Sequence, residues 1–157
     1  MWRACKIVLF TLVFPGTVTV LLPWRVLGYW HGVTPVSTAL GIPIISLGIL
    51  IYCLCAWDFG IHGEGTPAPW DAPRRLVRNR LYIAVRNPMY LGVLTTLLGE
   101  VALFQSRLLL EYMAVVWVGF HVFVLLVEEP ILHSKFGESY AAYCAVTPRW
   151  IPRLRAR

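Results

Sequence analysis

Four long apolar stretches constrain what this chain can fold into more than any other feature. They cover residues 5–23, 38–57, 89–105 and 108–127. About 20 consecutive apolar residues are enough for a helix to cross the hydrocarbon core of a bilayer. Of the 157 residues, 58% are hydrophobic and 14% are charged, whereas roughly a quarter are charged in a typical soluble domain. The pattern predicts an all-α fold, an integral membrane bundle of four transmembrane helices in a single domain over residues 1–157.

The placement of the basic residues predicts how this bundle is oriented. Arg25 and Arg107 lie at one surface of the predicted bundle, and the other twelve of the fourteen Lys and Arg residues lie at the opposite surface. Cytoplasmic loops of membrane proteins are enriched in Lys and Arg. We therefore expect both termini and the 58–88 connection to be cytoplasmic, in an inner or plasma membrane. We interpret the net charge of +6 as topology and contact with anionic lipid, and expect no nucleic acid partner.

The four cysteines do not have the spacing of a metal site or a disulfide framework. Cys5, Cys53, Cys55 and Cys144 form no Cys-x-x-Cys pair and have no partnered histidine. We expect all four to be reduced thiols, with no disulfide and no bound metal.

The segment YIAVRNPMYLG, at residues 82–92, opens the third apolar stretch with a helix start signal. Asn87 is suited to cap the first free backbone N–H groups, and Pro88 is well placed at the first helical position. The free N–H groups, the helix dipole and the adjacent Arg86 together attract an anion. Tyr90 adds a ring face and a hydroxyl at the same end. On these local features, an ordinary capped membrane helix with an interfacial tyrosine is the alternative explanation.

Glu128 and Glu129 stand side by side at the predicted end of the fourth helix. Adjacent carboxylates at a helix C-terminus repel each other and oppose the dipole, so a positive group is expected beside them. That group is either a nearby arginine or a cationic ligand. His121 lies seven residues before Glu128 and shares its helix face, as a packed core residue or as a polar residue of a site.

The third and fourth helices are joined only by Ser106 and Arg107, so they must form an antiparallel hairpin. The start of the third helix and the end of the fourth therefore meet at the same membrane surface. The start of the third helix suits an anion, and Glu128 and Glu129 at the end of the fourth suit a cation. A zwitterion carrying both groups fits between them.

The tail after the fourth helix mixes apolar, aromatic and basic residues. Its apolar and aromatic positions recur at steps of three and four residues, which predicts a short cytoplasmic amphipathic helix on the membrane surface. These positions are Ile131, Leu132, Phe136, Tyr140 and Tyr143.

Three blocks of sequence carry a resemblance to a known superfamily. LVRNRLYIAVRNPMYLG, EEPILHSKFGESYAAY and TPRWIPR, in this order, resemble the isoprenylcysteine carboxyl methyltransferase and phospholipid methyltransferase superfamily of integral membrane enzymes, over about residues 63–153. Its members bind S-adenosylmethionine without a Rossmann domain, and this chain has no Gly-x-Gly-x-x-Gly motif. The resemblance implies a cofactor pocket at the cytoplasmic ends of the last two helices, closed by the preceding loop and the tail.

The resemblance also implies roles for individual residues. The family's cofactor-binding acid matches Glu128. The implied cofactor contacts are Arg74, Leu76, Val77, Tyr82, Arg86, Asn87, Pro88, Met89, Tyr90 and Glu128. The implied catalytic residues are Glu128, Glu129 and Arg149, and the implied substrate-binding residues are Tyr140, Tyr143 and Arg149.

Two positions depart from the family pattern. Asn87 replaces the usual histidine of the family's Arg-His-Pro-x-Tyr motif, and an asparagine donates hydrogen bonds but cannot shuttle a proton at neutral pH. The second departure concerns the eukaryotic prenylcysteine enzymes of this superfamily, whose pattern has an arginine four residues before the cofactor-binding acid. This arginine reaches for the substrate carboxylate. Val124 stands at that position here.

We therefore expect a membrane methyltransferase that uses S-adenosylmethionine and acts on a lipophilic acceptor. The acceptor group is a carboxylate, as in an isoprenylcysteine, or an amine, as in a phospholipid. A carboxylate needs no base, whereas an ammonium must first lose a proton, for which Glu128, Glu129 and His121 are candidates. The expected partners are this lipophilic or lipid-modified substrate and the membrane lipids.

Three other functions remain as alternatives at this stage. One is a family member with a degenerate site that only binds lipid, against which the intact cofactor block argues. Membrane sterol and steroid reductases have a similar C-terminal region and use NADPH at a similar site, but the adjacent Glu128 and Glu129 favour the methyltransferase. A small four-helix transporter would use Glu100, in the third helix, and Glu111, near the start of the fourth, as ion-coupling residues. Interhelical hydrogen bonding, or exposure of Glu111 at the far interface, explains these acids without transport.

Overall fold

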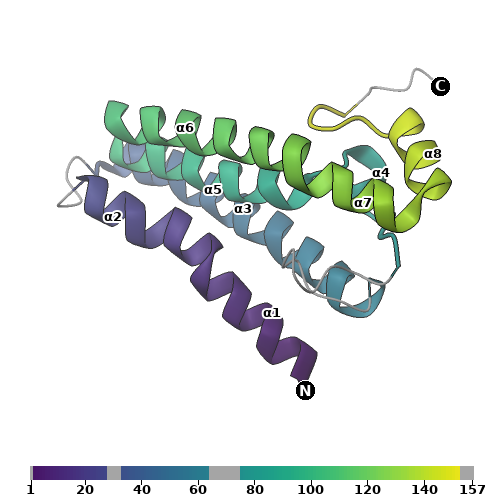
Figure 1. Cartoon of the computed structure of the whole chain (residues 1–157). Helices are drawn as coiled ribbons and strands as arrows, with labels where there is room; N and C mark the ends of the chain where they lie inside the picture. Colours follow the sequence, from purple (N-terminus) through teal and green to yellow (C-terminus); the bar gives the residue numbers. More distant parts are fainter. Residues whose placement is uncertain (1, 28–32, 64–74, 153–157) are drawn as a thin grey trace, which may run out of the picture.

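The computed structural model describes residues 2–27, 33–63 and 75–152, and these residues form helices with no strand among them. Figure 1 shows long helices that run alongside one another, with shorter helices gathered at one end. In chain order the helices are α1 (Trp2–Val13), α2 (Leu22–Leu27), α3 (Pro35–Ile61), α4 (Leu81–Ala84), α5 (Pro88–Phe104), α6 (Arg107–Phe123), α7 (Glu129–Phe136) and α8 (Glu138–Val146).

Among the described residues, three helical segments are long and apolar enough to cross a membrane. They are Cys5–Arg25, Pro35–Ile61 and Arg107–Phe136, and Pro88–Phe104 is a shorter apolar helix. The predicted all-α membrane bundle is therefore confirmed. The second predicted helix, at residues 38–57, is extended at both ends to the bounds of α3.

The first apolar stretch contains a π-helical turn, η1 (Thr17–Leu21), between α1 and α2. The wider turn leaves backbone carbonyls less regularly bonded than in an α-helix. The Tyr112 hydroxyl of α6 donates to the carbonyl oxygen of Val18 at 2.8 Å and ties this turn to the bundle.

Helices α3 and α5 pack through their backbones, because glycines line the surface between them. A Cβ atom on Gly41 of α3 would lie 2.9 Å from the carbonyl oxygen of Gly99, and one on Gly92 of α5 would lie 3.0 Å from that of Gly48. Small residues allow helices in lipid to approach this closely and to gain van der Waals contact. The packing is antiparallel, so the start of α5 lies beside the last turns of α3.

Helices α5 and α6 form the predicted hairpin. Gln105 adopts a left-handed conformation with φ of 48°, and Ser106 caps α6 by accepting a hydrogen bond from the backbone N–H of Leu109 at 3.3 Å. This connection leaves α5 and α6 antiparallel. The start of α5 and the far end of α6 therefore lie at the same end of the bundle, which we call the site end.

The predicted end of the fourth helix near residue 127 is wrong. The helix continues from α6 through a π-helical turn, η3 (Val124–Glu128), in which the backbone N–H of Glu129 donates to the carbonyl oxygen of Val124. Pro130 follows this π-helical turn directly, so the N–H that proline lacks falls where the regular α-helical hydrogen bonding is already interrupted. Glu128 and Glu129 thus lie inside a helical run and not at a C-terminus.

The predicted single tail helix is also wrong, because residues 131–143 belong to two helices. Helix α7 ends at Gly137, whose φ of +50° lies in the region that favours glycine. Helix α8 then turns back, and α7 and α8 pack against each other. The change of direction carries the end of the chain back toward the start of α5.

Candidate functional site

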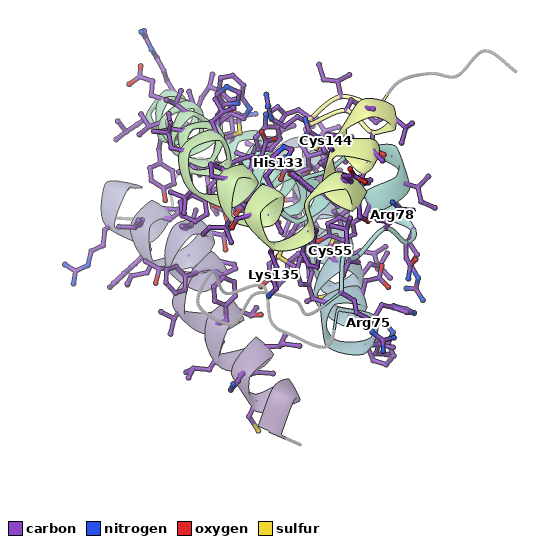
Figure 2. All side chains as sticks on the ribbon, turned by 45° about the vertical axis from the view of Figure 1, so that its right-hand side comes forward. Cys55, Arg75, Arg78, His133, Lys135 and Cys144 are labelled. Carbon is purple, nitrogen blue, oxygen red and sulfur yellow. The ribbon has the colours of Figure 1, made fainter. Side chains whose placement is uncertain are left out.

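Polar residues from four parts of the chain meet at the site end of the bundle. They come from the start of α5, from η3 and α7, from α8, and from residues 147–152, which we call the C-terminal strap. Figure 2 brings this end forward and shows Arg75, Arg78, Lys135 and Cys144 upon it. Several of the basic residues that the sequence assigned to one membrane surface thus lie at the same end as the polar cluster.

Tyr90 and Glu128 form the first contact of the site. The Tyr90 hydroxyl donates to Glu128 Oε2 at 2.7 Å, and this bond joins α5 to η3. The Tyr90 ring packs 4.8 Å from the Phe120 ring and 6.3 Å from the Trp150 ring, measured between centroids. Aromatic neighbours on two sides hold the hydroxyl toward the carboxylate.

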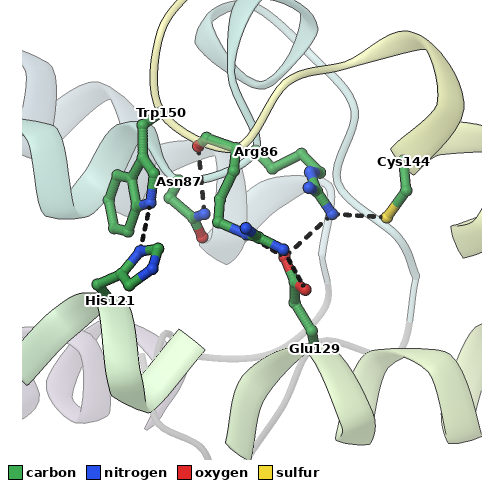
Figure 3. A network of polar contacts seen from close by, with 7 residues as sticks. Arg86, Asn87, His121, Glu129, Cys144 and Trp150 are labelled. Carbon is green, nitrogen blue, oxygen red and sulfur yellow. Dashed lines mark hydrogen bonds and ion pairs between the residues drawn. The ribbon is translucent and has the colours of Figure 1, made fainter. Parts of the chain in front are cut away.

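Glu129 is held by two arginines from distant parts of the chain (Figure 3). Arg149 donates from Nε to Oε1 at 2.8 Å and from Nη2 to Oε2 at 2.9 Å. Arg86 Nη1 lies 3.0 Å from the same Oε1. Paired bonds of this kind are stronger and more directional than neutral hydrogen bonds. The bond to Glu129 raises the pKa of Arg149 above its ordinary value, so Arg149 stays positively charged beside this carboxylate.

Arg86 connects Glu129 to α8 and to the strap. Its Nη1 donates to Cys144 Sγ at 2.8 Å, and its backbone N–H donates to the carbonyl oxygen of Pro148 at 2.8 Å. The side chain is 12% exposed, and its Nε is buried with no hydrogen-bond partner. A buried donor without a partner is costly, so Arg86 Nε is a position at which an acceptor would be stabilising.

Asn87 does not cap α5, although it stands at the capping position. Its side chain makes no capping hydrogen bond, and its Nδ2 instead donates to the carbonyl oxygen of Arg149 at 3.2 Å. The predicted cap is therefore wrong, because the strap competes for the side-chain amide. Pro88 occupies the first helical position as expected.

His121 is engaged by the strap as well. The indole N–H of Trp150 donates to His121 Nδ1 at 3.0 Å, and the imidazole stacks on Trp117 with ring centroids 5.7 Å apart. An indole can only donate, so Nδ1 is the acceptor and the neutral ring carries its proton on Nε2. His121 can accept a proton only at Nδ1, and only if it gives up Trp150.

The π-helical turn determines which residues of this helix face the strap. Trp150 reaches His121 and Arg149 reaches Glu129, although these two partners are eight residues apart. Two regular helical turns take up about seven residues, and a π turn adds one. His121 therefore shares a helix face with Glu129, and not with Glu128 as the sequence predicted. No signal in the sequence marks this turn.

Several residues implied by the resemblance pack in the core of the protein. Val77 and Tyr82 are buried against Cys55, and Met89 packs on the same cluster. The Tyr143 hydroxyl donates to the carbonyl oxygen of Tyr82 at 2.6 Å. Burial raises the pKa values of Tyr82 and Tyr143 above the ordinary range.

The remaining residues implied by the resemblance lie in α8, in the segment before α4, or outside the described residues. Tyr140 is buried in α8, and its ring stands edge-on to His133 at a centroid distance of 4.7 Å. Leu76 is half-buried in the segment before α4, and Arg74 lies outside the described residues. The structure thus brings together Arg86, Asn87, Tyr90, Glu128, Glu129 and Arg149.

Sequence reasoning missed three residues near this end. Trp150 and Cys144 contact the cluster, as described above. Asp58, in the last turn of α3, is 1% exposed, and its Oδ1 lies 3.4 Å from His62 Nδ1 and 3.6 Å from Arg80 Nε. The sequence signal for Asp58 was that it is the one acidic residue of the apolar helix α3. Asp58 joins the end of α3 to the segment before α4.

The two acids considered for transport have different surroundings. Glu111 is exposed and pairs with Arg107 at 3.0 Å, at the end of the bundle away from the site. Glu100 is 6% exposed on α5, and its Oε2 has no hydrogen-bond partner in the structure. Among the described residues, no group of three or more His, Cys, Asp or Glu side chains is placed to hold a metal ion.

The fold and the site define an integral membrane helical bundle with a cluster of paired charges at one end. The family model for phospholipid methyltransferase matches residues 36–139. The chain therefore belongs to the phospholipid methyltransferase family, whose members are integral membrane methyltransferases related to the isoprenylcysteine methyltransferase superfamily. The match includes α3, α5, α6 and α7 and ends just inside α8. No curated protein and no solved structure matches the chain.

Proposed function

We propose that this protein is an S-adenosylmethionine-dependent methyltransferase acting on a lipophilic acceptor, and that the cluster at the site end binds the cofactor. Membership of a family of membrane methyltransferases supports the reaction class. The observation that carries the assignment of the site is the convergence of two contacts. These are the bond from Tyr90 to Glu128 and the pairing of Arg86 and Arg149 with Glu129.

The residues of the cluster fit the methionine part of this cofactor, which carries an ammonium and a carboxylate. Glu128 accepts the Tyr90 hydroxyl at one oxygen, and a carboxylate has about four acceptor sites, so it retains capacity for an ammonium. The buried Nε of Arg86 lacks an acceptor and suits a carboxylate oxygen. The cluster thus offers the Glu128 carboxylate to the ammonium and Arg86 Nε to the carboxylate of the cofactor.

When bound, S-adenosylmethionine supplies a methyl group on a positively charged sulfur. The chain's own contribution is alignment, and holding two reactants in attack geometry can lower a barrier by on the order of 7 kcal/mol. Tyr90 fixes the Glu128 carboxylate, and Glu129 fixes Arg149 of the strap, which lies over the start of α5.

Glu128 is the best placed proton acceptor if the acceptor group is an amine. Both oxygens of Glu129 already accept guanidinium hydrogens. His121 accepts a proton only by losing Trp150. Val124, at the position of the carboxylate-reading arginine of prenylcysteine enzymes, is 1% exposed and offers no charge. If the acceptor group is a carboxylate, no base is needed.

We place the site end, both termini and the cofactor site on the cytoplasmic side of an inner or plasma membrane. The basic residues at the site end support this orientation. They include Arg78 and Lys135 (Figure 2), and Arg80, Arg86 and Arg149. A soluble cofactor would enter from this side, and a lipid-like acceptor from the bilayer.

Calorimetry of S-adenosylmethionine binding to detergent-purified protein tests the proposal. Glu128→Gln and Tyr90→Phe should each weaken binding by about tenfold, the usual effect of losing one charge-assisted hydrogen bond. Glu111→Gln is the matched control, because Glu111 is an exposed acid on the same continuous helical run. Absence of binding to well-folded wild-type protein would exclude the proposed function, and equal weakening by all three variants would exclude the proposed site.

A further inference from the structure

A second concave surface lies at the site end, between α4 and the end of α8. Its volume is about 520 Å³, within the range of small-molecule pockets. It is lined by Arg80, Ile83 and Ala84 on one side and by Ala145, Val146 and Pro148 on the other. None of these side chains belongs to the charged cluster, and we call this surface the α4–α8 groove.

The walls of the groove are apolar and unusually exposed for residues outside a membrane span. Ile83 is 67% exposed and Val146 is 57% exposed. Apolar patches of this kind mark surfaces that bind a partner or a lipid. Ile151 of the strap, adjacent to the groove residue Pro152, is 80% exposed and extends the same apolar surface.

Arg80 is the one charged residue among the described residues that line the groove. Arg80 lines it with a side chain that is half exposed, and none of its described lining residues is acidic. Arg80 Nε faces the buried Asp58 at 3.6 Å, which leaves the outer part of the guanidinium toward the groove. Arg78 lies on the same end of the bundle, over the ring of Tyr143 (Figure 2). An apolar groove with a guanidinium suits an amphiphile with an anionic head.

The strap that borders this groove contacts a helix long enough to span a membrane. Trp150 contacts His121, which lies within the apolar span Arg107–Phe136. The strap therefore reaches alongside a helix long enough to span a membrane, and a membrane lipid is the amphiphile that this position favours.

We infer that the α4–α8 groove is a binding site for an anionic phospholipid, separate from the site of methyl transfer. The acyl region lies against Ile83 and Val146, and the phosphate is bound by Arg80. Pro148 lines the groove and also accepts the backbone hydrogen bond of Arg86 at 2.8 Å. A bound lipid would therefore stabilise the strap over the charged cluster.

Native mass spectrometry of the detergent-purified protein tests this site, with phosphatidylglycerol and phosphatidylcholine of the same acyl chains as probes. Phosphatidylglycerol should be retained more strongly. Ala145→Trp, which fills the groove, should lower its retention by about tenfold, the effect of losing a packed and charge-assisted contact. Ala142→Trp is the matched control, since Ala142 is an exposed alanine of the same helix outside the groove.

Equal retention of the two lipids would overturn the inference. So would equal losses in the two tryptophan variants, because general attraction to the basic surface does not distinguish them. If Ala145→Trp does not fold, Arg80→Gln decides the question. Loss of the preference for phosphatidylglycerol in that variant supports the site, and an unchanged preference overturns it. The readout needs neither the cofactor nor a methyl acceptor.

Discussion

Replacing Gly48 by alanine tests whether backbone contact between α3 and α5 holds the site together. A Cβ at this position would lie 2.5 Å from the backbone nitrogen of Thr96 and 2.7 Å from the carbonyl oxygen of Gly92. These two atoms belong to the backbone of α5, so rotation of the Thr96 side chain, whose hydroxyl is also close, cannot relieve the contact. The two helices must separate by roughly 0.8 Å to reach an ordinary contact distance.

The cost of this separation can be isolated with a second glycine. Gly119, on α6, has no atom within 4 Å of the position of a Cβ. Glycine-to-alanine substitution in a helix gains about 1 kcal/mol of helix propensity at either site, so this gain cancels between the two variants. The remaining difference is overpacking, which costs about 1–3 kcal/mol. We expect a value at the upper end, because the backbone cannot yield.

Thermal unfolding of the two variants in the same detergent measures the difference. Gly48→Ala should unfold several degrees below Gly119→Ala, since roughly 2–4 °C corresponds to 1 kcal/mol in a domain of this size. Because Gly92 lies two residues after Tyr90, the same variant should also bind S-adenosylmethionine less tightly. A Gly48→Ala protein as stable as Gly119→Ala would refute the argument that α3 and α5 meet through their backbones.

Two further substitutions test the contacts of the strap. Arg149→Lys keeps the charge but cannot make two parallel bonds to Glu129, so it should cost about 1 kcal/mol of stability. The control is Arg107→Lys, in an exposed pair, which should cost nothing measurable in the same thermal assay. Trp150→Phe keeps an aromatic ring but removes the donor to His121 Nδ1. Nitrogen NMR of His121 should then show a changed balance between its two tautomers. An unchanged spectrum would mean that Trp150 does not select the tautomer.

Much of the bundle was predictable because its causes are local. A run of apolar residues long enough to cross a bilayer forms a helix wherever it stands, since a helix is the structure in which a single segment satisfies its own backbone groups in lipid. The start of α5 at Pro88 and the hairpin at Ser106 follow from residue types and from the shortness of the connection. The pairing of Glu129 with arginine was one of two expectations that the adjacent carboxylates raised.

The errors have a common physical origin in contacts between distant segments. Glu128, Glu129 and Pro130 read as a helix end, because charges and proline usually terminate an apolar helix. Arg86 and Arg149 neutralise Glu129 in the fold, and the π-helical turn accommodates the proline, so the helix continues. The amide of Asn87 was assigned to its own helix but is taken by the strap, 62 residues further along the chain.

The amino-acid sequence by itself determined that this chain is a helical membrane protein with a basic end, because hydrophobicity and charge act residue by residue. It also carried the order of blocks that marks the methyltransferase family. The tertiary structure alone decided that the strap joins the two clusters that the hairpin brings together. The strap reaches Asn87, His121 and Glu129 because Gly137 reverses the chain. Such contacts depend on where distant segments meet, and no local pattern encodes that.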